Sequence, residues 1–189
     1  MTRSEELFER FLVENELPYE RLDEDERRRA DFEVTVGGTS IVFEIKQIDG
    51  DGAWEEGPKG RIPGKKIRAL ISDAKGQLKR AAQEGKPAVL VVFNAWDPFQ
   101  LFGTEPNDFN TAMHGDWLVY LDRSTNKIIG SGRGGGKSLQ AAKNTSISAL
   151  AHLYDCGPAR TPSITLFENT FARHPINYAD LPACFEVAR

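Results

Sequence analysis

The stretch ADFEVTVGGTSIVFEIK, residues 30–46, decides the fold of this chain. Apolar residues alternate with polar ones in both halves, and Gly37-Gly38 separates the halves. Two alternating runs around a two-glycine loop predict a β-hairpin. Because a two-residue loop fixes the register, counting back from it places Asp31 directly across from Glu44.

This register brings two acids and a lysine to one face of the hairpin. Opposed residues have Cβ atoms roughly 5 Å apart, and Lys46 follows Glu44 on the same face at roughly 7 Å. Two opposed carboxylates destabilise a hairpin unless a cation lies between them. A divalent metal with oxygen ligands would supply that charge, and Lys46 would add to it. The group Asp31, Glu44 and Lys46 therefore predicts metal-assisted hydrolysis of a phosphodiester.

Further elements are predicted on both sides of the hairpin. Apolar residues at helical spacing predict a helix over residues 4–16, with Ser4 as its N-cap. A second helix is predicted over residues 65–84, with Gly85 at its C-terminal end. The continuous apolar run 87–93 predicts a strand that is buried on both faces.

At Asp31, Glu44 and Lys46 the chain resembles the PD-(D/E)XK nuclease superfamily. Ala30 stands where the motif has proline. The resemblance implies an α/β, restriction-endonuclease-like fold: a central mixed β-sheet flanked by helices, with a helix–strand–strand–helix–strand core and a C-terminal sheet extension. The whole chain, 1–189, is then one nuclease-like domain with its core in about 4–93 and the extension in about 94–189.

The resemblance also implies roles for the site residues. Asp31, Glu44 and the Ile45 carbonyl would bind Mg²⁺, for which Mn²⁺ could substitute. Lys46 would orient or deprotonate the attacking water. Two residues outside the motif complete the expected catalytic group: Glu5 of the first helix, with Glu9 as second choice, and Gln77 of the second helix. Some subfamilies carry Tyr four residues after this glutamine, where the present chain has Ala81.

A basic cluster follows the hairpin in a chain whose net charge is −4. We expect its N-terminal part to contact nucleic-acid phosphates, and these residues are Lys59, Arg61, Lys65, Lys66 and Arg68. A solvated helix face is the alternative interpretation of the same cluster. The glycine-rich loop 49–64, which contains Trp54, is predicted to fold over a substrate or to be a plain loop.

The second half of the chain has weaker patterns. Residues 116–121 and 126–129 predict another hairpin, and 162–167 predicts a late strand. Residues 147–154 fit strand or helix equally well. The long segment 94–115 is expected to be irregular.

Composition limits the class of protein. No apolar run approaches the roughly 20 residues that cross a membrane, and the N-terminal residues lack a secretory apolar core. Two cysteines without a CxxC motif do not predict a disulfide scaffold, so a cytoplasmic protein is expected. The stretch 132–138 lacks the first glycine of a phosphate-binding loop.

Two other functions compete with a nuclease. The fold could serve only for nucleic-acid binding or assembly, which cleavage assays would distinguish. Alternatively, Asp31, Glu44 and Lys46 could form an ordinary cross-strand ion-pair cluster. The expected partner is DNA rather than RNA, with no membrane. The resemblance allows a homodimer, although no heptad or apolar patch in the sequence predicts one.

Overall fold

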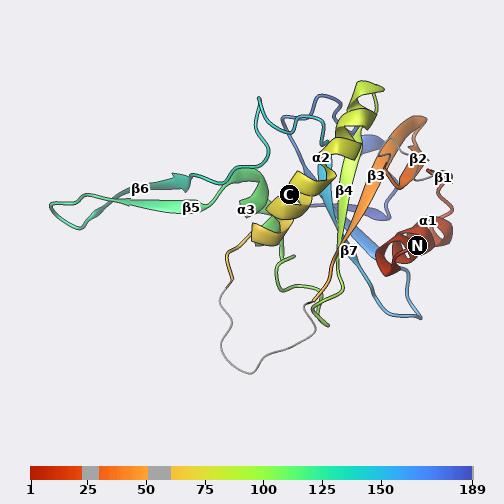
Figure 1. Cartoon of the computed structure of the whole chain (residues 1–189), viewed down its shortest axis with the longest axis horizontal. Coiled ribbons are helices and arrows are strands. Elements are labelled where there is room, and N and C mark those ends of the chain that lie inside the picture. Colours follow the sequence, from red (N-terminus) through yellow and green to blue (C-terminus); the bar gives the residue numbers. More distant parts are fainter. Residues whose placement is uncertain (23–29, 51–60, 189) are drawn as a thin grey trace.

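The protein is described from a computed structural model, which covers residues 1–22, 30–50 and 61–188. Its centre is a seven-stranded mixed sheet with the strand order β1-β2-β3-β4-β7-β8-β9 (Figure 1). The strands of this sheet are β1 (Tyr19–Arg21), β2 (Phe32–Val36), β3 (Thr39–Ile48), β4 (Ala88–Asn94), β7 (Ala149–Tyr154), β8 (Ser163–Glu168) and β9 (Phe185–Val187). The expectation of an α/β protein with helices on a mixed sheet is confirmed.

The β2–β3 hairpin has the predicted register. Val36 pairs with Thr39, and Phe32 pairs with Phe43. Asp31 precedes β2, and its N–H donates to the Phe43 carbonyl at 3.1 Å. Gly37 and Gly38 both have positive φ, at 55° and 79°, as a two-residue turn that matches the twist of the strands requires.

Helix α2 (Lys65–Gln83) connects β3 to β4, which lies parallel to it. A parallel connection needs a crossover, and a helix commonly forms it. The helix ends as predicted, with Gly85 at a φ of 80°. All seven residues of β4 are buried, as the apolar run predicts.

The sheet separates two apolar cores. On one face, helix α1 (Arg3–Glu14) packs through Leu7, Phe8, Phe11 and Leu12. On the other face, α2 and helix α3 (Pro106–His114) pack over Val42, Ile48 and Leu90. Because side chains alternate along a strand, Glu44 and Lys46 lie on the α2 face between Val42 and Ile48.

The N-cap of α1 is Thr2, so the prediction of Ser4 is wrong. Thr2 accepts a hydrogen bond from the Glu5 N–H, and the Glu5 side chain accepts one from the Thr2 N–H. This reciprocal capping box begins the helix before Ser4, which is buried in its first turn.

Helix α3 contradicts the irregular segment expected over 94–115. Pro106 occupies its first turn, and the Glu105 and Asp108 carboxylates cap its free N–H groups. Nine residues with a weak apolar stripe give little periodic signal, so its capping residues were the better indication.

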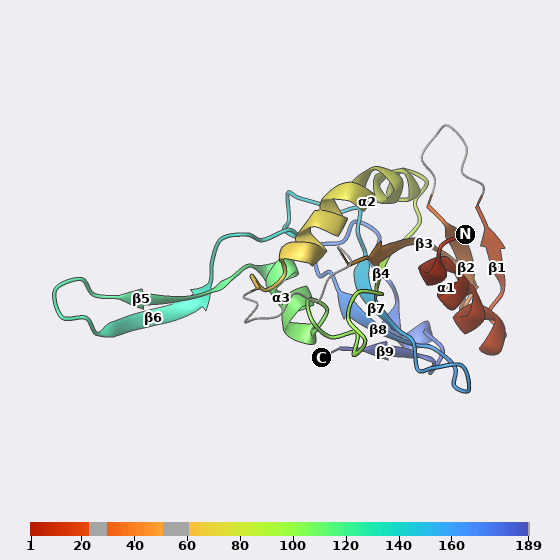
Figure 2. The same cartoon turned by 60° about the horizontal axis from the view of Figure 1, so that its bottom comes forward.

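A second, two-stranded sheet leaves the body as an arm. Strands β5 (Trp117–Leu121) and β6 (Ile128–Arg133) form the second predicted hairpin, and Figures 1 and 2 show it projecting beyond α3. Residues 149–154 form a strand, which decides between the two expectations for that segment. No helix in the described ranges is long and apolar enough to cross a membrane.

Candidate carboxylate and lysine site

Strand β3 and the residue before β2 bring the predicted acids together. The Asp31 carboxylate accepts a hydrogen bond from the Ile45 N–H at 2.6 Å, and its charge raises the pKa of Glu44. The N–H and C=O of one strand residue point to the same edge. The Ile45 carbonyl therefore also lies on the β2 edge, beyond the last pair of that hairpin.

Glu44 is a buried acid with one unpartnered oxygen. The residue is 2% exposed, and its Oε1 lies 2.9 Å from the Lys46 ammonium. Its Oε2 is buried with no hydrogen-bond partner among the described residues. Burial, and next the Asp31 charge, raise the pKa of Glu44 to about 7, although Lys46 opposes the shift.

Asp73, on α2, is a third acid at the site. Its Oδ2 lies 3.2 Å from the Lys46 Nζ, so the lysine bridges Glu44 and Asp73. Burial alone would lower the pKa of Lys46, but the ion pairs with Glu44 and then Asp73 outweigh burial and raise it. The sequence shows Asp73 only as the one acid of a basic helix. Finding its role required the packing of α2 on β3.

Gln77 lies one helical turn beyond Asp73 and lines a neighbouring cleft of about 240 Å³. Ala30, which precedes Asp31, lines the same cleft. So does Val42, which lies two residues before Glu44. Lys86 and Arg80 contribute cations to its wall, each paired with Glu84, and Lys86 also pairs with Glu33. Asp31, Glu44 and Lys46 do not line this cleft, so Gln77 lies in the neighbouring cleft rather than among the site residues.

The two helix acids have other partners. Glu5 takes part in the capping box and pairs with Arg21 of β1 at 3.0 Å. Glu9 accepts a hydrogen bond from the Tyr19 hydroxyl at 2.9 Å. These contacts link the two acids to β1 and to the N-terminus of α1 rather than to Lys46.

The basic cluster has mixed surroundings. Arg61 pairs with Glu105 and Asp108, and Arg68 pairs with Asp116 at 2.6 Å. The Lys66 ammonium lies 3.5 Å from the centre of the Trp96 ring.

Lys65 is exposed at the first position of α2. Lys59 and Trp54 lie outside the described residues. The ion pairs of Arg61 and Arg68 connect the start of α2 and the residues before it to α3 and to Asp116, which precedes the arm.

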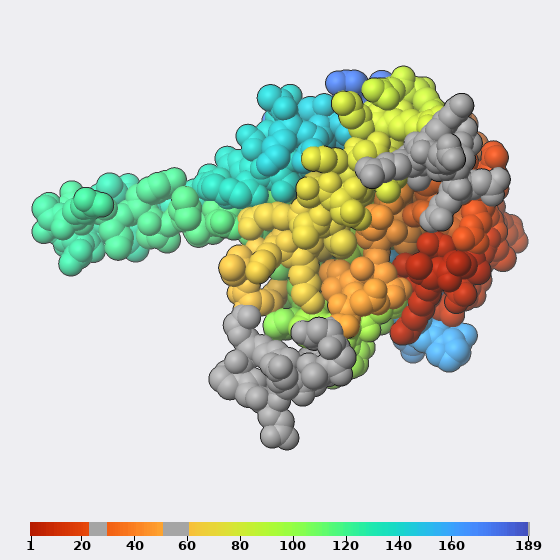
Figure 3. Space-filling view, viewed as in Figure 1, coloured from red at the N-terminus to blue at the C-terminus, as the bar shows by residue number. Residues whose placement is uncertain are grey.

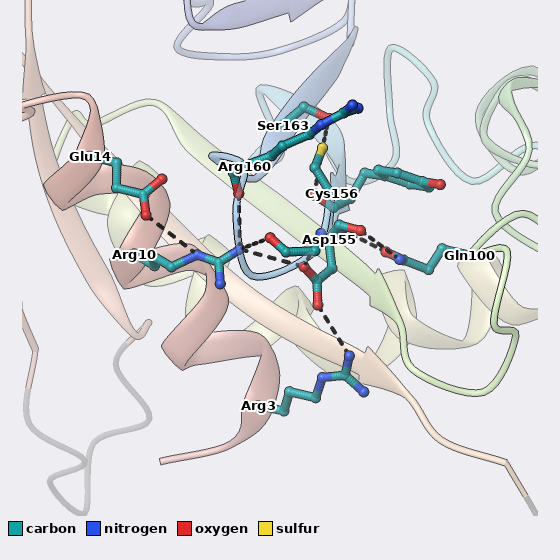
Figure 4. A network of polar contacts seen from close by, with 10 residues as sticks. Arg3, Arg10, Glu14, Gln100, Asp155, Cys156, Arg160 and Ser163 are labelled. Atoms are coloured by element: carbon teal, nitrogen blue, oxygen red, sulfur yellow. Dashed lines mark hydrogen bonds and ion pairs between the residues drawn. The ribbon is translucent and has the colours of Figure 1, made fainter.

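A separate polar network joins α1 to the turn after β7 (Figure 4). Asp155 pairs with Arg3 at 3.1 Å and with Arg10 at 3.4 Å. Its backbone N–H and C=O bond the Gln100 side chain at 2.7 and 3.0 Å. Each of these contacts joins a donor to an acceptor. We therefore interpret the network as structural, linking α1 to this turn.

The residues fit a small divalent cation only if water molecules complete its coordination. The described ranges contain no group of three or more His, Cys, Asp or Glu side chains placed to hold a metal. Asp31, the unpartnered Glu44 oxygen and the Ile45 carbonyl are compatible with Mg²⁺, which takes one or two carboxylates and keeps several waters. Comparison of the chain with protein-family models, curated proteins and solved structures gives no match.

Proposed function

We propose that this protein is a metal-dependent nuclease with a restriction-endonuclease-like fold, which hydrolyses phosphodiester bonds in DNA. The observation that carries the proposal is the buried, unpartnered Oε2 of Glu44 beside Asp31 and Lys46. Burying a carboxylate oxygen without a hydrogen-bond partner costs free energy, even where the other oxygen is paired. A fold that retains such an oxygen next to a second carboxylate has a site that a cation would complete.

The order of elements supports the same proposal. Helix α1, the β2–β3 hairpin, helix α2 and strand β4 follow one another along the chain. This is the helix–strand–strand–helix–strand order that the resemblance implies, with β1 added at the edge.

Each residue would have a distinct part. Asp31, Glu44 and the Ile45 carbonyl would hold Mg²⁺, which would acidify a bound water and offset charge on the phosphate. Lys46 would remain charged, because its ion pairs raise its pKa, and it would stabilise the negative charge that develops at phosphorus. Gln77, in the adjoining cleft, would orient a phosphate oxygen or the water.

Cleavage of plasmid and single-stranded DNA with Mg²⁺, Mn²⁺ or EDTA tests the proposal. We expect cutting with either metal and none with EDTA. Asp31→Asn should lose metal binding and cutting, whereas Lys46→Ala should keep Mn²⁺ binding by calorimetry and lose turnover by about 10²-fold or more. Lys127→Ala, in the arm, is the control that should cut normally.

Two outcomes would favour the competing functions. Metal-independent DNA binding without cutting would indicate a binding module. The bridge from Lys46 to Glu44 and Asp73 favours a structural ion-pair cluster as the second candidate. Absence of both Mn²⁺ binding and DNA binding in the wild type would support that cluster and refute the nuclease.

A further inference from the structure

The β5–β6 arm exposes an unusual amount of apolar surface. Seven of the thirteen large hydrophobic residues that are exposed in the described ranges lie on it. They are Trp117, Leu118, Val119, Tyr120, Leu121, Ile128 and Ile129, with exposed fractions from 39% to 70%. Figure 3 shows this hairpin standing clear of the body. A two-stranded hairpin is marginally stable alone in water, so a surface that covers this arm would stabilise it.

One face of the arm carries most of that surface. Trp117, Val119 and Leu121 alternate along β5 and share a face, and Ile128 lies opposite Leu121 on the same face. On the other face Leu118 lies against the backbone of Gly134, where an added Cβ would come within 2.0 Å of its Cδ1. The first face is therefore the docking surface, and we call it the Val119 face.

The charged residues of the arm lie at its two ends, with Asp122, Arg123 and Lys127 in the turn between β5 and β6. Strand β5 contains no charged residue. Asp116, before it, pairs with Arg68, and the Arg133 guanidinium lies 5.7 Å from the centre of the Trp117 ring. Arg133 lies opposite Trp117 at the base of the Val119 face and is its one cation among the described pairs. A surface that follows a phosphate backbone needs a row of cations, so this face fits an apolar partner.

The area of the Val119 face is near the lower limit for a specific dimer. With about 200 Å² for a large side chain, Trp117, Val119, Leu121 and Ile128 expose roughly 470 Å², so two such faces bury about 950 Å² together, close to the roughly 1,000 Å² at which specific interfaces begin. An identical arm offers the same apolar side chains and the same area, and a two-fold axis buries both at once.

From these observations we propose that two copies of the chain form a dimer in which the Val119 faces of their arms pack against each other. The outer edge of β5 is consistent with a covered arm, because it lacks the Lys or Pro residues that commonly protect an exposed edge. The dimer requires neither metal nor nucleic acid and is independent of the proposed nuclease site.

Sedimentation and light scattering of the full chain test this dimer. We expect the wild type to have twice the 21.0 kDa mass of the chain. Val119→Lys and, separately, Ile128→Lys should raise the dimer dissociation constant by about a hundredfold or more, because each would bury an unpaired charge. Val119→Ile, which keeps the face apolar, and Tyr120→Lys, on the opposite face, should remain dimeric.

Circular dichroism melting shows whether each variant folds. The two lysine substitutions lie on different strands, so the test remains possible if one of the variants does not fold. A monomeric wild type would overturn the proposal. So would a Val119→Lys protein that is folded and still dimeric, or a Tyr120→Lys protein that dissociates as readily as Val119→Lys. Association that appears only when duplex DNA is added would also overturn it.

Discussion

At the scale of single residues, Glu44 combines burial, a neighbouring acid and an unpartnered oxygen. Its pKa of about 7 lies above the ordinary value of 4.5. Between these two values the folded protein binds more protons than the unfolded chain. Ionised Glu44 therefore lowers the free energy of unfolding as pH rises through this range, and the full cost is present above about pH 7.

We expect Glu44→Gln to raise the free energy of unfolding at pH 8 in EDTA by about 1–3 kcal/mol. The amide removes the buried charge and can still accept a hydrogen bond from Lys46. Urea titration measures the change. Added Mg²⁺ should stabilise the wild type and leave Glu44→Gln unaffected, because metal binds only the folded carboxylate site.

Glu33→Gln is the matched control on the same hairpin. Burial opposes ionisation of Glu33, but hydrogen bonds from Lys86 and Ser40 lower its pKa. Its neutralisation should therefore reduce stability. A loss of stability in Glu44→Gln equal to that in Glu33→Gln would show that Glu44 is an ordinary ion-pair acid.

His152 should make the free energy of unfolding depend on pH in the acidic range. Burial lowers its pKa from 6.5 to about 4, and its ring lies 5.7 Å from that of Phe109. The unfolded chain binds the additional proton between these values, so this group makes stability fall as pH drops from about 6.5 to about 4. The loss should reach up to about 3 kcal/mol.

His152→Phe should remove that part of the acid sensitivity, as urea titrations at pH 7 and pH 4.5 would show. Tyr154→Phe, beside the ring at 6.1 Å, keeps the histidine and should retain the wild-type pH dependence. Equal acid sensitivity in His152→Phe and the wild type would contradict the prediction.

At the scale of elements, the cations near the start of α2 differ in their surroundings. Arg61 is paired with buried Asp108, whereas Lys65 is exposed. Asp108 is 1% exposed and accepts hydrogen bonds from the Gly64 N–H and from Arg61. Arg61→Ala leaves this buried carboxylate without its cation, and we expect it to cost about 2–4 kcal/mol of stability. Chemical denaturation measures that loss.

Lys65→Ala, by contrast, should change stability by less than about 0.5 kcal/mol. Under the proposed function it should weaken DNA binding and reduce the slope of affinity against salt by about one. Unchanged DNA affinity across salt concentrations would exclude Lys65 from phosphate contact.

The elements also show what local sequence can predict. The β2–β3 register follows from two glycines and an alternating pattern, so it could be predicted that Asp31 lies beside the Glu44–Ile45 part of β3. Asp73 could not be added, because its distance from Lys46 depends on how α2 packs on the sheet. Helix α3 was missed because capping residues, rather than apolar periodicity, define it.

At the scale of the whole molecule, the last strands belong to the same sheet as the first. Strand β9 extends the sheet next to β8, and its Phe185 contacts α1 and β3. The ring of Phe185 lies 5.3 Å from that of Phe11 and 6.3 Å from that of Phe43. A sequence pattern could not place these aromatic residues together, because they are far apart along the chain and β9 has only three residues.

This packing predicts that the N-terminal and C-terminal halves unfold together. Phe185→Ala should lower the free energy of unfolding by about 3–4 kcal/mol, through lost burial and the cavity left between α1 and the sheet. The transition should stay single when followed by both circular dichroism and tryptophan fluorescence. Glu186→Ala, which removes an exposed side chain from the same strand, is the control and should change stability little. Two separate transitions in Phe185→Ala would contradict this prediction. They would mean that residues 1–94 form a core that folds independently of the later strands and does not need β9.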